Sequence, residues 1–226
     1  MINFINSNEN ILFLREGSQK HLNTKYLNGH TLNIHNLNIQ PFEFISLLSE
    51  KLVILSKIED RLYLINDIRE NINNFILKSG DLSPFISFRL INSSYFSNAK
   101  NKYNVSKDWH IDSSVVTLVC TYSGKGTEWV SSDSVLQRDN KLIKPEFLKK
   151  ESTIYKALPG DVLLIKGEMR KEEDQDTIKF LSKIGVYNKG FSYNEGNGLV
   201  HRGPGFSFGD NPRLLLTISS FKKKVS

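Results

Sequence analysis

Apolar residues between positions 41 and 79 recur mostly at intervals of three and four. The residues with this spacing are Phe42, Ile45, Leu48, Leu52 and Leu55, followed by Leu62, Ile65, Ile68, Ile72, Ile76 and Leu77. Such spacing collects apolar side chains on one face of a helix. The pattern therefore predicts two amphipathic helices whose apolar faces pack against the rest of the chain. Residues 1–40 show no clean period, so we interpret 1–80 as an N-terminal extension with room for short strands, within the same domain as the remainder.

After Gly80 the pattern changes to short runs rich in β-branched and aromatic residues, separated by Gly, Asn, Ser, Asp and Pro. These runs are residues 85–91, 115–122, 154–157, 162–165, 184–187, 198–201 and 214–221. No helical pattern of adequate length separates most of them, which favours many short strands over an alternating α/β sheet. We predict a mainly β (α+β) fold in which residues 81–226 form a barrel or jelly roll packed against two helices. The charged stretch 166–183 is interpreted as a surface excursion, not a site.

Composition agrees with one folded domain outside the membrane. The chain has 226 residues, 39% hydrophobic and 24% charged, and no run approaches the roughly 18 apolar residues of a membrane span. Its N-terminus lacks the features of a secretory signal, so we expect a cytoplasmic protein. The net charge of +6 favours anionic partners without specifying one. No basic stripe with interleaved aromatics stands out, which leaves nucleic-acid demethylation a minor alternative.

The single cysteine, Cys120, excludes an intrachain disulfide framework and a multi-cysteine metal site. It lies in an apolar run, where a thiol behaves as a small hydrophobe, and this disfavours a cysteine nucleophile. The glycines of residues 124–129 lack the spacing of a phosphate-binding loop, so we interpret that block as a hairpin bend that presents Trp129. Trp129 and Trp109 are candidates to line a substrate mouth.

Candidate chemistry begins with Trp109-His110-Ile111-Asp112. On an extended chain, residues two apart share a face, so His110 and Asp112 can grip one metal ion. A downstream histidine, His201, would complete two nitrogens and one oxygen, the facial triad typical of oxygen-activating iron(II). The alternatives are that His110 is a hydrogen-bonded structural histidine, that Asp112 caps the turn that follows it, and that His201 lies at a capped strand end.

The order of these residues resembles that of the iron(II)/2-oxoglutarate dioxygenases over roughly residues 85–221. The resemblance is carried by His110-x-Asp112, then Leu158-Pro159-Gly160-Asp161 before an apolar strand, then His201, then Arg213. More narrowly, the chain is similar to a bacterial family classed among domains of unknown function. This similarity lies in Trp109-His110-x-Asp112, Cys120-Thr121-Tyr122-x-Gly124-x-Gly126-Thr127-x-Trp129 and Val200-His201-Arg202.

The resemblance implies a double-stranded β-helix, a cupin-like barrel, in which the catalytic residues His110, Asp112 and His201 bind Fe(II) and 2-oxoglutarate chelates the metal. Arg213 is the candidate for the far carboxylate, because a planar guanidinium offers two parallel hydrogen bonds. Thr217 or Tyr122 would assist it. The family's usual Ser or Thr two residues after the arginine is replaced here by Leu215, so Arg89 and Arg202 remain alternatives.

The implied activity is an oxidoreductase that hydroxylates or otherwise oxidises a C–H bond, with succinate and carbon dioxide as co-products. A small-molecule substrate is expected, with a protein or nucleic-acid substrate as alternatives; the sequence leaves substrate identity and oligomeric state open. The alternative from another class is a non-catalytic cupin-like metal-binding or sensory protein that holds zinc, nickel or manganese with the same triad.

Overall fold

The computed structural model describes residues 1–16, 22, 24–35, 40–80, 82–92, 95, 107–138, 142–169, 178–179, 182, 192–205 and 210–222. The helices are α1 (Ile2–Ile5), α2 (Pro41–Lys51) and α3 (Ile58–Ser79), with 3-10 turns η1 (Lys25–Leu27), η2 (Leu52–Ile54), η4 (Ser132–Ser134) and η5 (Pro145–Phe147). The strands are β1 (Ile11–Arg15), β2 (Asn33–His35), β3 (Leu82–Ile91), β4 (Trp109–His110), β5 (Val116–Ser123), β6 (Glu128–Trp129), β7 (Leu142–Ile143), β8 (Tyr155–Lys156), β9 (Val162–Lys166), β10 (His201–Arg202) and β11 (Arg213–Lys222).

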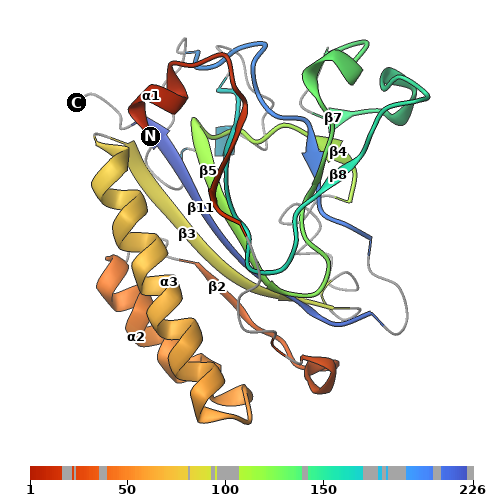
Figure 1. Ribbon diagram of the computed structural model, residues 1–226. Helices are drawn as coiled ribbons and strands as arrows, with labels where there is room; N and C mark the ends of the chain where they lie inside the picture. The colour runs from red at the N-terminus through yellow and green to blue at the C-terminus, as the bar shows by residue number, and fades with distance from the viewer. Residues whose placement is uncertain are drawn as a thin grey trace.

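The strands form two antiparallel sheets. The larger has the order β1-β9-β5-β11-β3-β2, and the smaller has the order β7-β4-β10-β6-β8. Figure 1 shows the two long helices on one side of the larger sheet and the smaller sheet on the other. The N-terminal strands β1 and β2 are the two edges of the larger sheet, where they pair with β9 and β3. The N-terminal extension is therefore built into the sheet that supports the rest of the molecule.

Helices α2 and α3 bury one face each against the larger sheet. Phe44 and Phe75 from the helices join Phe88, Leu216 and Ile218 from β3 and β11 in one apolar cluster. Helix α2 begins at Pro41, and a capping box between Gln40 and Glu43 satisfies the first N–H groups of the helix. Burial of aromatic and aliphatic side chains at this interface supplies the main stabilisation of the helices.

The opposite face of the larger sheet is turned toward the smaller sheet. Along β11, Leu214, Leu216 and Ile218 lie in the helix-side cluster, whereas Leu215 lies in a second cluster with Val119, Leu163 and Trp129. Because successive side chains of a strand point to opposite faces, Arg213 and Thr217 share the side of Leu215. Polar residues at these positions therefore project between the two sheets.

A polar network fastens the edge strand β1 to α3. The Arg15 guanidinium donates to both oxygens of Asp67, at 2.7 and 3.1 Å. The Tyr122 hydroxyl donates to Asp67 Oδ2 at 2.7 Å, and Asn71 Nδ2 donates to the same oxygen at 2.9 Å. Asp67 is buried, so these donors offset the cost of removing its charge from water. Cys120 is buried beside this network, and burial raises the pKa of its thiol to about 12.

The two predicted helices and the strands at 85–91, 115–122, 162–165 and 214–221 are confirmed. The run 154–157 contains β8, the run 198–201 becomes a strand only at His201, and 184–187 lies outside the described residues. The predicted apolar stripe was wrong in part: Phe42, Leu62 and Leu77 are exposed. Phe44, Leu64 and Phe75 are buried instead, because the sheet selects a helix face rotated from the one that the spacing indicated.

The interpretation of 166–183 as a surface excursion is wrong at its start. Lys166 ends β9 and is fully buried, donating to the carbonyl of Ser7, and Glu168 and Met169 are also buried. The charged ends of Lys166 and Glu168 have partners inside the fold, which sequence composition does not reveal. No helix among the described residues combines the length and the apolar character needed to cross a bilayer.

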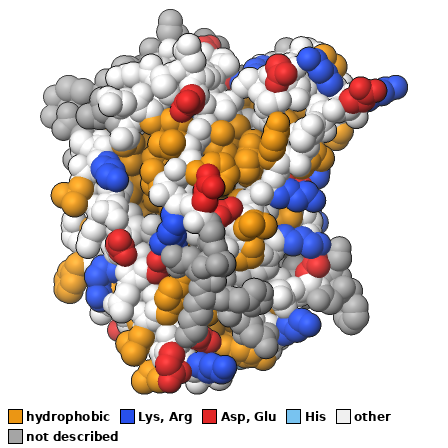
Figure 2. All heavy atoms as spheres, in the orientation of Figure 1, with side chains coloured by type: hydrophobic (Ala, Val, Ile, Leu, Met, Phe, Trp, Pro, Cys, Tyr) orange, Lys and Arg blue, Asp and Glu red, His pale blue; other side chains and the backbone are white. Residues whose placement is uncertain are grey.

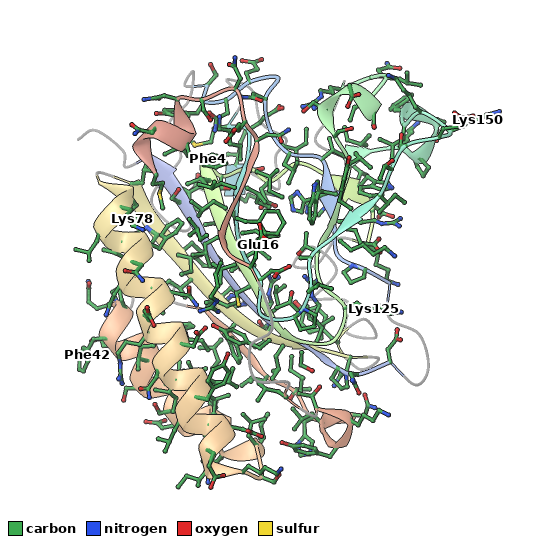
Figure 3. All side chains as sticks on the ribbon, in the orientation of Figure 1. Phe4, Glu16, Phe42, Lys78, Lys125 and Lys150 are labelled. Carbon is green, nitrogen blue, oxygen red and sulfur yellow. The ribbon has the colours of Figure 1, made fainter. Side chains whose placement is uncertain are left out.

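Two phenylalanines on α2 provide a test of this packing. Phe44 is fully buried, whereas Phe42 is 77% exposed and points away from the sheet (Figure 3). We expect Phe44→Ala to lower the free energy of unfolding by about 3–5 kcal/mol through lost apolar contacts and the cavity left behind. Phe42→Ala, the same chemical change, should alter it by less than about 1 kcal/mol. Urea denaturation of both variants measures the difference, and equal losses would contradict the helix orientation.

Candidate metal centre

Strands β4 and β10 bring two histidines from distant parts of the sequence together. His201 and His110 are direct partners in the antiparallel pairing, with ring centroids 4.3 Å apart. Asp112 follows two residues after His110, and its Oδ1 lies 3.6 Å from Nε2 of each histidine. One donor atom from each of the three residues lies within 4.8 Å of the others, the one such group among the described residues. The predicted triad is therefore assembled.

Backbone carbonyls orient both imidazoles. His110 Nδ1 lies 2.9 Å from the carbonyl oxygen of Asp108, and His201 Nδ1 lies 3.1 Å from that of Leu199. A carbonyl oxygen can only accept, so Nδ1 carries the proton in each ring and a neutral imidazole keeps its lone pair on Nε2. Those Nε2 atoms are the ones that face Asp112. A carbonyl partner behind a ligating histidine is a usual support in metal sites.

The charges of the triad are those of a metal-binding set. Burial and, to a smaller extent, the neighbouring His110 together lower the pKa of His201 to about 4, so this imidazole is neutral near pH 7. Burial would raise the pKa of Asp112, but His201, His110 and the Thr117 hydroxyl outweigh it and hold that pKa well below its usual range. Burial would lower the pKa of His110, but the neighbouring Asp112 carboxylate outweighs burial and raises it.

Two imidazole nitrogens and one carboxylate oxygen fit a single divalent transition metal. Bonds of about 2.1 Å to each donor allow two donors to stand up to about 4.2 Å apart across one ion, and both Nε2–Oδ1 separations of 3.6 Å fall inside that limit. The side chains of His110 and Asp112 are 21% and 27% exposed, whereas His201 is 7% exposed. The centre is thus open to solvent on the side of β4.

Arg213 lies between the sheets with neutral partners. Its Nη2 donates to Thr127 Oγ1 at 2.8 Å and to Thr121 Oγ1 at 3.2 Å, and the residue is 5% exposed. Burial, reinforced by the nearby Arg89 guanidinium, lowers the pKa of Arg213 to about 9. No carboxylate within the described part of the chain forms an ion pair with it. A buried cation held by hydroxyls alone is a favourable place for an anion from outside the chain.

A second buried guanidinium stands beside it on β3. Arg89 is 7% exposed, and its Nη2 donates to Thr217 Oγ1 at 3.2 Å. Burial lowers the pKa of Arg89, while Tyr95 and Asp112 oppose that shift. Thr217 thus lies on the predicted face but contacts Arg89 and not Arg213. The hydroxyl of Ser87, also on this face of β3, is buried and has no hydrogen-bond partner among the residues that the structure describes.

Two sequence-based assignments are corrected. Tyr122 was expected to assist the co-substrate carboxylate, but its hydroxyl donates to Asp67 on the helix side of the larger sheet. Its neighbour Thr121 faces Arg213 instead, because adjacent strand residues point to opposite faces. Arg202 was an alternative co-substrate ligand, but it pairs with Glu128 at 2.8 Å and covers the ring of Trp109 at 4.3 Å. It follows His201 directly and so lies on the other face of the smaller sheet.

The block 124–129 is not a hairpin bend. Strands β5 and β6 belong to different sheets, and the segment between them, marked by Lys125 in Figure 3, crosses from one sheet to the other. Gly124 has φ +77° and lies so close to β11 that an added Cβ would stand 2.9 Å from Arg213 Cα. The crossing therefore delivers Thr127 to the Arg213 guanidinium. Sequence reasoning missed this role, although Thr121 and Thr127 both stand in the motif.

Trp129 does stand next to the triad, as the direct strand partner of His201. Its ring stacks on Tyr155 at 5.8 Å and meets Phe13 of β1 edge-on at 5.9 Å. Figure 2 shows apolar side chains gathered on the face between β1 and the smaller sheet. Trp109 lies on the outer face of the smaller sheet, against Arg202, so the expectation that it lines the same mouth is wrong.

Residues 101–184, less than half of the chain, match the family described as "Protein of unknown function (DUF1826)". A search of curated proteins gives no match.

Two solved structures are weakly similar to this chain. The dioxygenase for auxin oxidation 1 from Arabidopsis thaliana, in its 2-oxoglutarate complex, has 12% identity and a TM-score of 0.38, covering 86% of this chain and 63% of its own. A full-length protein from Neurospora crassa in complex with alpha-KG has 16% identity and a TM-score of 0.26, covering 62% of this chain and 33% of its own. The chain spans less than two thirds of either, and such low scores do not establish a common fold.

The lowered pKa of His201 predicts a pH effect on the metal-free protein. Between pH 6.5 and about 4 the unfolded chain binds a proton at this residue that the folded chain does not. The stability that His201 contributes is complete above pH 6.5 and is lost as the pH falls through that window. We expect His201→Gln to flatten the pH dependence of the urea midpoint there, in the presence of a chelator. The same substitution at exposed His30 is the control, and parallel curves for both variants would refute the assignment.

Proposed function

We propose that this chain is an iron(II)- and 2-oxoglutarate-dependent oxygenase built on an open double-stranded β-helix. The observation that carries the proposal is the convergence of His110, Asp112 and His201 at one end of an inter-sheet space in which Arg213 lies buried without a carboxylate partner among the described residues. The triad offers a cation site, and the guanidinium offers an anion site. A 2-oxo dicarboxylate carries the groups that would use both.

His110, Asp112 and His201 would hold the metal through two Nε2 atoms and a carboxylate oxygen, a set that suits iron(II) and leaves other coordination positions open. Iron(II) bound there would activate dioxygen for oxidation of a substrate C–H bond, coupled to conversion of 2-oxoglutarate to succinate and carbon dioxide. The carbonyls of Asp108 and Leu199 keep both rings in the ligating tautomer. Asp112 stays ionised and so remains a ligand over the physiological range.

Arg213 would bind the far carboxylate of 2-oxoglutarate. The hydroxyls of Thr121 and Thr127 accept hydrogen bonds from Nε and Nη2 and hold the guanidinium in place, which leaves the two N–H groups of Nη1 for a carboxylate. The replacement of the usual hydroxyl residue by Leu215 is compensated by these two threonines from β5 and the crossing segment. Arg89, whose Nη2 donates to Thr217, adds positive potential near Arg213.

The same observation disfavours a purely metal-binding or sensory barrel. Such a protein needs the triad but does not need the buried Arg213 guanidinium. A buried guanidinium without an anionic partner lowers stability. We propose a small-molecule substrate that reaches the centre from the exposed side of His110 and Asp112. The single buried cysteine suits a reducing compartment, and we propose the cytoplasm as the place of action.

The direct test is incubation of the purified protein with iron(II), 2-oxoglutarate and air. We expect slow succinate formation without added substrate, and its loss in His110→Ala, which removes one ligand. His30→Ala, a change at an exposed histidine, is the control. Tightly held zinc together with no succinate from the iron-loaded protein would favour the non-catalytic alternative.

Co-substrate binding gives a second prediction. Arg213→Lys keeps the charge but loses the planar pair of donors, and we expect the Kd for 2-oxoglutarate to rise by at least about tenfold. Isothermal titration with the metal-loaded protein measures this. Arg202→Lys is the matched control, since Arg202 lies on the other face of the smaller sheet, and Tyr122→Phe should also leave the Kd unchanged. A normal Kd in Arg213→Lys would remove Arg213 from the site.

A further inference from the structure

The residues that directly follow β9 lie between two segments of the metal centre, the one that carries Asp112 and the one that leads to His201. Glu168 is 1% exposed, and its backbone N–H donates to the carbonyl of Asp112 at 2.8 Å. Its side-chain Oε1 accepts from the N–H of Gly198, three residues before His201, at 3.1 Å. One residue is therefore bonded both to a member of the triad and to the segment that delivers another member.

Two glycines make this junction tight. An added Cβ at Gly167 would stand 2.3 Å from the carbonyl oxygen of Ser114 and 2.7 Å from that of Asp112. At Gly198 it would stand 2.3 Å from Ile111 Cγ2 and 2.7 Å from Glu168 Cγ. Real Cβ atoms do not approach so closely, so neither position has room for a side chain. At Gly167 the backbone packs against the carbonyls of Asp112 and Ser114, and at Gly198 the backbone packs against the side chains of Ile111 and Glu168.

Arg138 completes the junction from the solvent side. Its Nη1 lies 3.5 Å from Glu168 Oε1 and donates to the carbonyls of Gly198 at 3.0 Å and Gly196 at 3.2 Å. A carboxylate as buried as that of Glu168 requires a partner of opposite charge or several donors. Arg138 supplies the charge and at the same time holds the 196–198 segment. Neither side chain belongs to the triad.

We propose that Glu168, supported by Arg138, is a positioning residue that fixes the separation of the Asp112 and His201 donor atoms and thereby sets the affinity of the metal centre. This inference rests on the proposed function, because it presupposes that the triad binds a divalent metal. Glu168 is not one of the three donor residues of the triad. It acts through the Asp112 carbonyl and the Gly198 N–H, as residues behind metal ligands commonly do.

The test is titration of the metal-free protein with Co(II), followed by the visible absorbance of the bound ion, so that the readout does not depend on turnover. Glu168→Ala removes the acceptor for Gly198, and we expect the Co(II) Kd to rise by about 10–100-fold. Glu168→Gln keeps an oxygen in the place of Oε1 and should restore affinity to within a few fold. Glu146→Ala is the matched control, because Glu146 is exposed and forms an ion pair with the exposed Lys144.

The outcomes separate the two proposals. Wild-type protein that fails to bind Co(II) would sink the metal centre and this inference together. Wild-type binding with an unchanged Kd in Glu168→Ala would overturn the positioning role alone, even where the thermal midpoint of the metal-free variant falls, since that fall is what a merely structural residue produces. Where Glu168→Ala does not fold, Arg138→Gln replaces it, with a rise of at least about tenfold expected and an unchanged Kd counting against the proposal.

Discussion

The antiparallel pairing of β4 with β10 is the constraint on which the candidate site depends. Each strand is only two residues long, yet the register places His201 directly opposite His110. A slip by one residue would turn Arg202, not His201, toward Asp112, because neighbouring strand residues face opposite sides. The flanking pairs help to hold this register: β7 lies on the other side of β4, and β6 on the other side of β10.

Charge burial organises the space between the sheets. Asp112 carries a negative charge near one end, while Arg213 and Arg89 carry positive charges along the larger sheet. Hydroxyl groups, not carboxylates, support Arg213, so the guanidinium is positioned without being neutralised. On the helix side of the same sheet the situation is opposite, since Arg15 and Asp67 pair directly and complete a structural network. The larger sheet thus separates a helix-side network in which the charges are paired from an inter-sheet space in which the Arg213 charge has only hydroxyl partners among the described residues.

The Asp112 segment and the segment before His201 are linked through Glu168, which lies in a stretch whose sequence resembles a charged surface loop. Glu168 joins the Asp112 carbonyl to the Gly198 N–H. Gly167 leaves room for the Asp112 and Ser114 carbonyls, and Gly198 leaves room for the Ile111 and Glu168 side chains. This explains why a short strand such as β10 can present His201 in a fixed place. The backbone before it is bonded to β9 and to the Glu168 junction, through Leu199 N–H to Lys166 and Gly198 N–H to Glu168.

The amino-acid sequence predicted helices α2 and α3, the runs that form β3, β5, β9 and β11, and the three candidate donor residues. Apolar periodicity is a local property, so helices α2 and α3 and the long strands could be read from it, and His110-x-Asp112 places two donors on one face wherever that strand lies. Only the tertiary structure decided which helix face is buried, that Tyr122 serves the helix side while Thr121 and Thr127 hold Arg213, and that Glu168 is buried at the junction. The reason is physical: the side of a sheet that a residue faces, and the partner that neutralises a buried charge, are set by contacts between segments tens of residues apart, which no local pattern encodes.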